Sequence, residues 1–146
     1  MGVGYEGRDI GAFVTDLLAE GVSRVVDVRM TPLSRKPGFS KTRLASALAD
    51  AGIDYEHRRE LGNPKPNRAG FGGTPEQLDA ARETFVGLLA DPQAAAAVDA
   101  IAASAERERV ALLCFEADQQ RCHRDLVIGE VARRLTAAAG NRPRAR

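Results

Sequence analysis

The chain has 146 residues, of which 44% are hydrophobic and 28% are charged, and its formal net charge is +1. This length suits one ordinary core and is short for two domains, and the composition excludes a disordered or fibrous protein. No apolar run approaches the ~18 residues that a membrane-spanning helix requires, and the start carries no signal peptide or lipidation motif. We therefore expect a cytoplasmic protein without a membrane partner, with one domain over residues 1–139 and a disordered basic tail over residues 140–146.

Hydrophobic periodicity, capping residues and turn signals divide the chain into alternating strands and helices. The expected strands cover residues 1–5, 24–28, 53–57 and a stretch from 110, and the expected helices cover residues 10–20, 41–51, 75–89, 92–105 and 122–135. Asp9 and Ser40 are the expected N-caps of the first two helices, and Thr74 forms a capping box with Gln77. Residues 58–73 are typical of a long irregular loop.

This order of elements predicts parallel strand pairing through right-handed crossovers. The expected fold class is α/β, a three-layer fold with a mostly parallel sheet of about four strands flanked by helices. The short, alternating strand over residues 53–57 suits a sheet edge.

Each expected strand is followed by an unusual polar segment. These segments are Tyr5–Arg8, Arg29–Lys41, His57–Lys65 and Glu116–Arg124. In open parallel sheets, ligands bind beyond the carboxyl ends of the strands. We therefore expect the four segments to meet at one edge of the sheet and to form the functional site there.

Basic residues are concentrated in these segments, and residues 29–68 hold nine basic against four acidic side chains. Guanidinium groups match phosphate oxygens in bidentate fashion, and a helix N-terminus also favours an anion. We expect a phosphate-sized anion site, and its candidate residues are Arg8, Arg29, Arg35, Lys41, Lys65 and Arg124.

Three carboxylates accompany these cations and suggest a substrate with both a phosphate and a reactive centre, such as a nucleotide or a nucleic acid. Glu6 and Glu116 could form a carboxylate pair that stabilises an oxocarbenium-like centre at a glycosidic bond. Asp27 lies inside a buried strand, where it serves either a structural bond or catalysis.

Cysteine chemistry offers a competing hypothesis. Cys122 lies at an expected helix start beside His123, where a thiol with a lowered pKa can act as a nucleophile, whereas Cys114 lies inside an apolar strand. The phosphatase pattern of a cysteine, five residues and an arginine fails, because Arg121 falls one place too late after Cys114. For His123 and His57, a hydrogen-bonded packing role, anion binding and proton transfer all remain open.

No metal or cofactor is expected. The spacing of Cys114, Cys122 and His123 matches no closed zinc knuckle. Adjacent side chains on a helix also diverge by about 100 degrees, so joint ligation by Cys122 and His123 is awkward.

Five motifs resemble those of the domain-of-unknown-function 488 (DUF 488) family of bacterial and archaeal proteins. They are GYEGR at Gly4–Arg8, DVR at Asp27–Arg29, SRKPGFSK at Ser34–Lys41, LGNPK at Leu61–Lys65, and LLCFE followed by CHR at Cys122–Arg124. The resemblance spans nearly the whole chain. It implies a compact α/β domain with these motifs at one edge, and it implies no particular activity.

The leading hypothesis is an enzyme that binds a phosphate-bearing small molecule or nucleic acid. Its expected catalytic residues are Glu6, Asp27, Glu116, Cys122 and His123. The alternative is a module that binds nucleic acid without chemistry, which should lose affinity steeply with salt and tolerate changes of Glu6 or Asp27.

Overall fold

The computed structural model describes residues 1–143, and within this range it contains one four-stranded sheet in which all strands run parallel. The strands are β1 (Gly2–Gly4), β2 (Arg24–Asp27), β3 (Asp54–His57) and β4 (Val110–Cys114). They are arranged in the order β1-β4-β2-β3. The strand over residues 54–57 is therefore an edge strand, as its alternating sequence predicts.

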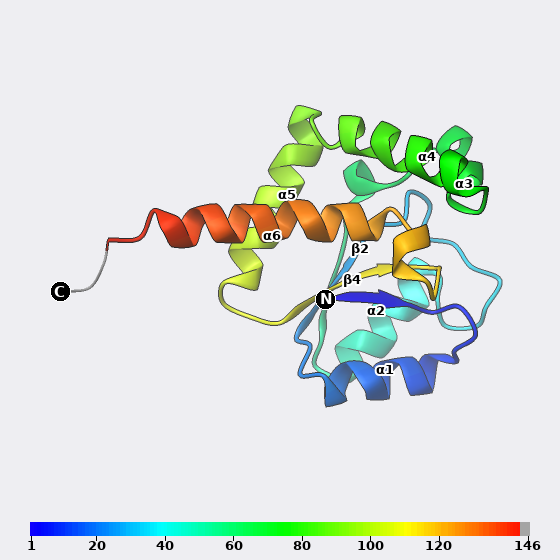
Figure 1. Ribbon diagram of the computed structural model, residues 1–146. Helices are drawn as coiled ribbons and strands as arrows, with labels where there is room; N and C mark the ends of the chain where they lie inside the picture. The colour runs from blue at the N-terminus through cyan, green and yellow to red at the C-terminus, as the bar shows by residue number, and fades with distance from the viewer. Residues whose placement is uncertain (144–146) are drawn as a thin grey trace.

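Helices cover both faces of this sheet, as Figure 1 shows. The described helices are α1 (Ile10–Ala19), α2 (Lys41–Asp50), α3 (Lys65–Phe71), α4 (Pro75–Leu88), α5 (Pro92–Ala105) and α6 (Arg124–Gly140). α1 and α2 lie on one face and α5 and α6 on the other, while α3 and α4 extend beyond the carboxyl ends of the strands. The expected three-layer α/β fold is confirmed.

Successive side chains of the central strands supply two separate cores, because neighbouring residues of a strand point to opposite faces. Val25 and Leu113 pack with α1 and α2, whereas Val26 and Leu112 pack with α4, α5 and α6. All five residues of β4 are buried. The sheet is thus covered on both faces, and its carboxyl edge is the place where polar segments gather.

Two of the three expected helix caps form as the sequence predicts. The Asp9 carboxylate accepts a hydrogen bond from Ala12 N at 2.8 Å, and Thr74 and Gln77 make both bonds of the capping box. Ser40 precedes α2 but makes no side-chain cap bond. Its hydroxyl instead accepts a hydrogen bond from Ser34 N and donates one to Ser34 O. These two bonds close the basic loop, residues 29–41, on itself.

The prediction of an irregular loop over residues 58–73 is wrong. This segment contains the 3-10 turn η1 (Arg59–Leu61) and the helix α3. Its proline and glycine content disfavours a helix, but tertiary contacts compensate: Phe71 is buried, and the Asn67 amide donates to Ala81 O at 3.0 Å. Packing against α4 therefore overrides local propensity.

The final helix α6 continues to Gly140, five residues beyond the Leu135 at which the sequence pattern weakens. Residues 144–146 of the expected basic tail lie outside the described residues. In the described range no single helix is long and apolar enough to cross a membrane. Only α4 and α5 taken together, bent by 88°, meet the criteria of length and composition.

Candidate functional site

A cavity of about 330 Å³ lies at the carboxyl edge of the sheet. Its lining residues come from all four of the segments that follow the strands. They include Tyr5 after β1, Arg29, Leu33 and Ser34 after β2, Asn63 after β3, and Cys114, Glu116, Arg121, Cys122 and His123 at and after the end of β4. The parallel topology thus brings these segments together, as connectivity predicts.

The floor of this cavity holds both cysteines and one histidine. His123 Nε2 lies 2.8 Å from Val28 O. Because a carbonyl oxygen only accepts, Nε2 carries a hydrogen that it donates to Val28 O, and Nδ1 faces the two sulfurs. His123 Nδ1 lies 3.8 Å from Cys122 Sγ and 3.9 Å from Cys114 Sγ.

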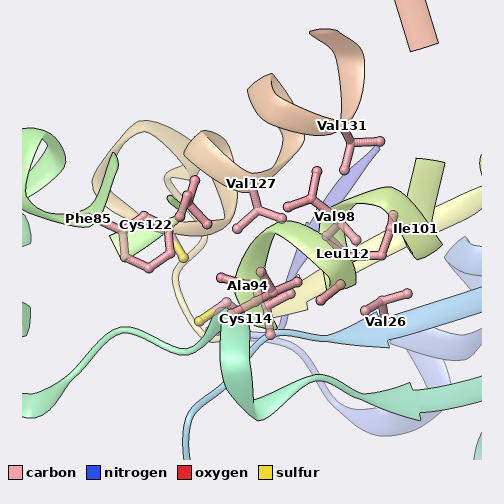
Figure 2. Packing of buried hydrophobic residues seen from close by; sticks show 14 of the residues in the cluster. Val26, Phe85, Ala94, Val98, Ile101, Leu112, Cys114, Cys122, Val127 and Val131 are labelled. Atoms are coloured by element: carbon pink, nitrogen blue, oxygen red, sulfur yellow. The ribbon is translucent and has the colours of Figure 1, made fainter. Parts of the chain in front are cut away.

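Figure 2 shows the two cysteines at one end of the apolar cluster, close to Phe85. Cys114 is 7% exposed and Cys122 is 1% exposed, and both are free thiols. The Phe85 ring meets the His123 ring edge-on, with ring centroids 5.1 Å apart. The sulfurs therefore lie where the core ends and the cavity begins.

Cys122 and His123 converge, contrary to the expected divergence. Cys122 is not yet helical: its φ of -139° and ψ of 141° are extended, and only His123 adopts helical dihedrals before α6 begins. The angle of about 100 degrees between neighbours applies only inside a helix. The short turn η2 (Gln119–Arg121) sets this backbone and aims both side chains inward.

The environment of the two thiols separates their acidities. A hydrogen bond from Cys114 and another from His123 lower the pKa of Cys122, although burial opposes this shift. The same contact with Cys122, together with burial, raises the pKa of Cys114. The pKa values of the two thiols at the floor of the cavity are therefore shifted in opposite directions.

Glu116 lines the same cavity, and its Oε2 is buried without a hydrogen-bond partner in the described chain. Burial and the neighbouring Cys122 raise the pKa of this carboxyl group. Glu116 is thus the expected catalytic carboxylate that lies beside the sulfur pair.

Two arginines of the cavity wall were not among the residues expected from the sequence. Arg68 Nε donates to Asn63 O at 3.0 Å, and Arg121 Nη1 donates to Phe71 O and Gly73 O. Each guanidinium keeps donors beyond these bonds. Arg121 lies within a segment that the sequence singles out, whereas Arg68 lies on α3, the helix that local propensity does not indicate.

Asp27 and Arg29 form part of a buried network at the wall of the cavity, which Arg29 also lines. Asp27 accepts bonds from Arg29 and from the Tyr55 hydroxyl, the latter at 2.6 Å. Arg29 Nη1 also donates to Tyr5 Oη and to Phe39 O. These bonds hold together the segments at the ends of β1, β2 and β3.

Three other expected site residues lie in a second cavity of about 460 Å³, beside β1 and α1. Glu6 accepts a bond from Ala117 N, and Arg8 pairs with Asp16. Arg124 is 2% exposed, and its Nε and Nη1 have no hydrogen-bond partner among the described residues. Glu6 and Glu116 therefore line different cavities and do not face one substrate as a pair.

The remaining expected cations lie on the surface. Arg35 and Lys41 line a hollow of about 410 Å³ on the basic loop, together with Lys36 and Arg43. Lys65 is exposed at the first residue of α3 and does not line the carboxyl-edge cavity. His57, the second histidine, donates from Nε2 to Arg29 O at 2.7 Å and so supports the buried network.

The sequence matches one known protein family over most of its length. Residues 9–131 match the family described as "Domain of unknown function DUF488". The chain belongs to the DUF488 family. The match confirms the resemblance seen in the motifs, although the GYEGR motif at Gly4–Arg8 lies before the matched residues. For this DUF488 chain, no match was found among curated proteins or among solved structures.

Proposed function

We propose that this protein is an enzyme that acts on a phosphate-bearing substrate, a nucleotide or a nucleic-acid segment, in the cavity at the carboxyl edge. One observation carries the proposal. Leu33 and Ser34 line both this cavity and the basic hollow on the following loop. A reactive cavity thus adjoins a surface that is suited to phosphates.

The basic hollow would bind the phosphates of the substrate, a contribution that does not depend on the base sequence of a nucleic acid. Arg35, Lys36, Lys41 and Arg43 surround it. Arg68 and Arg121 extend the positive wall into the cavity, where their unused donors can pair with phosphate oxygens. A substrate with one phosphate in the cavity and another in the hollow would use both groups of cations.

The reactive part of the site is Glu116 with the sulfur–imidazole floor. Glu116 presents a buried carboxyl oxygen that has no hydrogen-bond partner among the described residues. Such an oxygen is free to accept a proton from a substrate, as a general base does. Cys122 and His123, the other two expected catalytic residues of this cavity, lie below it. Glu6 and Asp27 have no place in this mechanism.

The proposal is tested with a panel of mononucleotides and short oligonucleotides, with products detected by mass spectrometry and binding by calorimetry. We expect Glu116→Gln to abolish turnover and to keep affinity. Arg35→Gln should weaken binding and reduce the salt slope by about 1, because each phosphate contact releases counterions. Arg107→Gln, at the opposite end of β4, is the matched control and should change neither quantity.

Binding without any product from the whole panel would contradict the enzyme and favour a nucleic-acid-binding module. Equal losses of affinity in Arg35→Gln and Arg107→Gln would contradict the basic hollow as the binding surface. We also place the protein in the cytoplasm, and its two free, buried thiols support a reducing compartment.

A further inference from the structure

We propose that Cys114, Cys122 and His123 form a binding site for a soft divalent metal ion, with zinc as the first candidate. The three ligand atoms lie within 4.8 Å of one another, and all three side chains are buried. The inference deepens the proposed function and rests on it for its catalytic meaning, because the site forms the floor of the same cavity.

The distances suit a tetrahedral ion. Zinc binds thiolate sulfur at about 2.3 Å and imidazole nitrogen at about 2.0–2.1 Å, so tetrahedral ligands place sulfur and nitrogen about 3.6 Å apart. The two sulfur–nitrogen distances to His123 Nδ1 are 3.8 and 3.9 Å. Side-chain shifts of a few tenths of an ångström would bring both sulfur–nitrogen distances to this value, and the two sulfurs, which lie within 4.8 Å of each other, would approach the ion together.

Hydrogen bonding alone leaves this arrangement incompletely explained. Nδ1 of an imidazole makes one hydrogen bond, as donor or as acceptor. Yet the sulfurs of Cys114 and Cys122 lie at almost equal distances from it. A single cation between the three atoms uses the lone pair and both sulfurs at once.

The orientation of His123 also fits a ligand. Histidines that bind metals usually donate their other ring N–H to a carbonyl or carboxylate, which fixes the tautomer and the ring plane. His123 Nε2 donates to Val28 O at 2.8 Å, and Phe85 packs against the ring. The backbone of β2 and a side chain of α4 thus hold the imidazole in its ligating position.

Three protein ligands leave one position of a tetrahedral ion open, which is the pattern of catalytic rather than structural zinc sites. The cavity lies above this position, and Glu116 lines it with an oxygen that lacks a partner in the described residues. The fourth ligand would be water or an oxygen of the substrate. Glu116 would lie beside that ligand.

The decisive experiment needs no substrate. The full chain is expressed with supplemented zinc, dialysed without chelator, and analysed for metal per chain; a second sample is loaded with Co²⁺ and its absorption spectrum recorded. We expect about one zinc ion per chain and an intense thiolate-to-cobalt charge-transfer band, as two thiolate ligands require. Cys114→Ser and Cys122→Ser should each lose most of the metal and of the band.

His123→Gln should also lose metal, whereas His57→Gln, which changes the chain's other histidine, should keep it. Circular dichroism verifies the fold of each variant. If a cysteine variant fails to fold, the wild-type chain provides a second readout: bound zinc should slow alkylation of both thiols, and a chelator should restore the rate.

Absence of stoichiometric zinc together with absence of the cobalt band in the wild-type chain would overturn the proposal. Equal metal retention in Cys122→Ser and wild type would overturn it as well, because the ion would then lie elsewhere. Failure of the proposed function would give a different result from failure of the metal site. In that case the chain would bind zinc through these residues but would turn over no phosphate-bearing compound.

Discussion

Asp27 and Arg29 form a bidentate ion pair that is buried where β2 ends. Arg29 Nε lies 2.9 Å from Asp27 Oδ1, and Arg29 Nη2 lies 2.7 Å from Asp27 Oδ2. Asp27 is 0% exposed. Because the pair also engages Tyr5, Tyr55 and Phe39, it joins the segments on which the carboxyl-edge cavity is built.

Asp27→Asn should lower the free energy of unfolding by about 3–5 kcal/mol, because it leaves the buried guanidinium of Arg29 without its counter-charge. Urea denaturation measures this loss. Asp54→Asn is the matched control, since the Asp54 side chain is 70% exposed and forms an ion pair with Arg24 at the protein surface. Its loss should stay below about 1 kcal/mol, and similar losses in the two variants would contradict a stabilising role of the buried pair.

Tyr55 should make the fold sensitive to alkaline pH. Burial and the hydrogen bond to Asp27 raise the pKa of Tyr55 in the folded chain. The unfolded chain therefore releases this proton first, and the free energy of unfolding should fall as the pH rises above about 10. Urea denaturation at pH values on both sides of this limit checks the slope, which should be smaller in Tyr55→Phe; equal slopes would contradict the raised pKa.

Arg124→Met should stabilise the chain in buffer without phosphate. The Arg124 guanidinium is buried at the first residue of α6, and two of its nitrogens have no partner among residues 1–143. Replacing buried charge by an apolar side chain of similar length is expected to add about 1–4 kcal/mol to the free energy of unfolding.

Arg134→Met is the control for this change, because Arg134 lies on the same helix in a more exposed ion pair with Asp99. Thermal unfolding of both variants should show a gain for Arg124→Met alone. A marked loss in Arg124→Met would indicate that Arg124 has an anionic partner in solution.

Gly4→Ala should disturb the segment that carries Glu116. A Cβ at Gly4 would lie 2.0 Å from Glu116 O, so the backbone after β4 must move. We expect a loss of about 1–3 kcal/mol, which thermal or urea unfolding measures. Gly87→Ala lies in α4 with no atom within 4 Å of the added Cβ, and it should instead gain up to about 1 kcal/mol; a neutral Gly4→Ala would contradict the close approach.

The sequence alone determined the layer architecture and the edge at which the site forms. Strand and helix patterns alternate along the chain, so parallel pairing brings the segments after β1, β2, β3 and β4 to one side of the sheet. The motifs also indicate the family, and the sequence predicts Glu116, Cys122 and His123 as residues of the site at this edge.

Only the tertiary structure decided which of these residues meet. Glu6 and Arg8 lie in a motif as distinctive as that of Cys122, and Arg124 belongs to the Cys122 motif itself, yet all three line a separate cavity beside α1. The separation of residues along the sequence does not show on which side of β4 the side chain of a loop residue lies. Local sequence does not indicate Arg68, because its helix α3 is held by contacts with α4 rather than by its own propensity.

The convergence of the two cysteines and His123 is the clearest case. Helical geometry applied to neighbouring residues predicts divergence, but the extended backbone of Cys122 places its sulfur 3.8 Å from His123 Nδ1. That conformation depends on η2 and on the bond from His123 to Val28, a residue 95 positions away. Local sequence proposes the ligands, and a long-range hydrogen bond decides where they point.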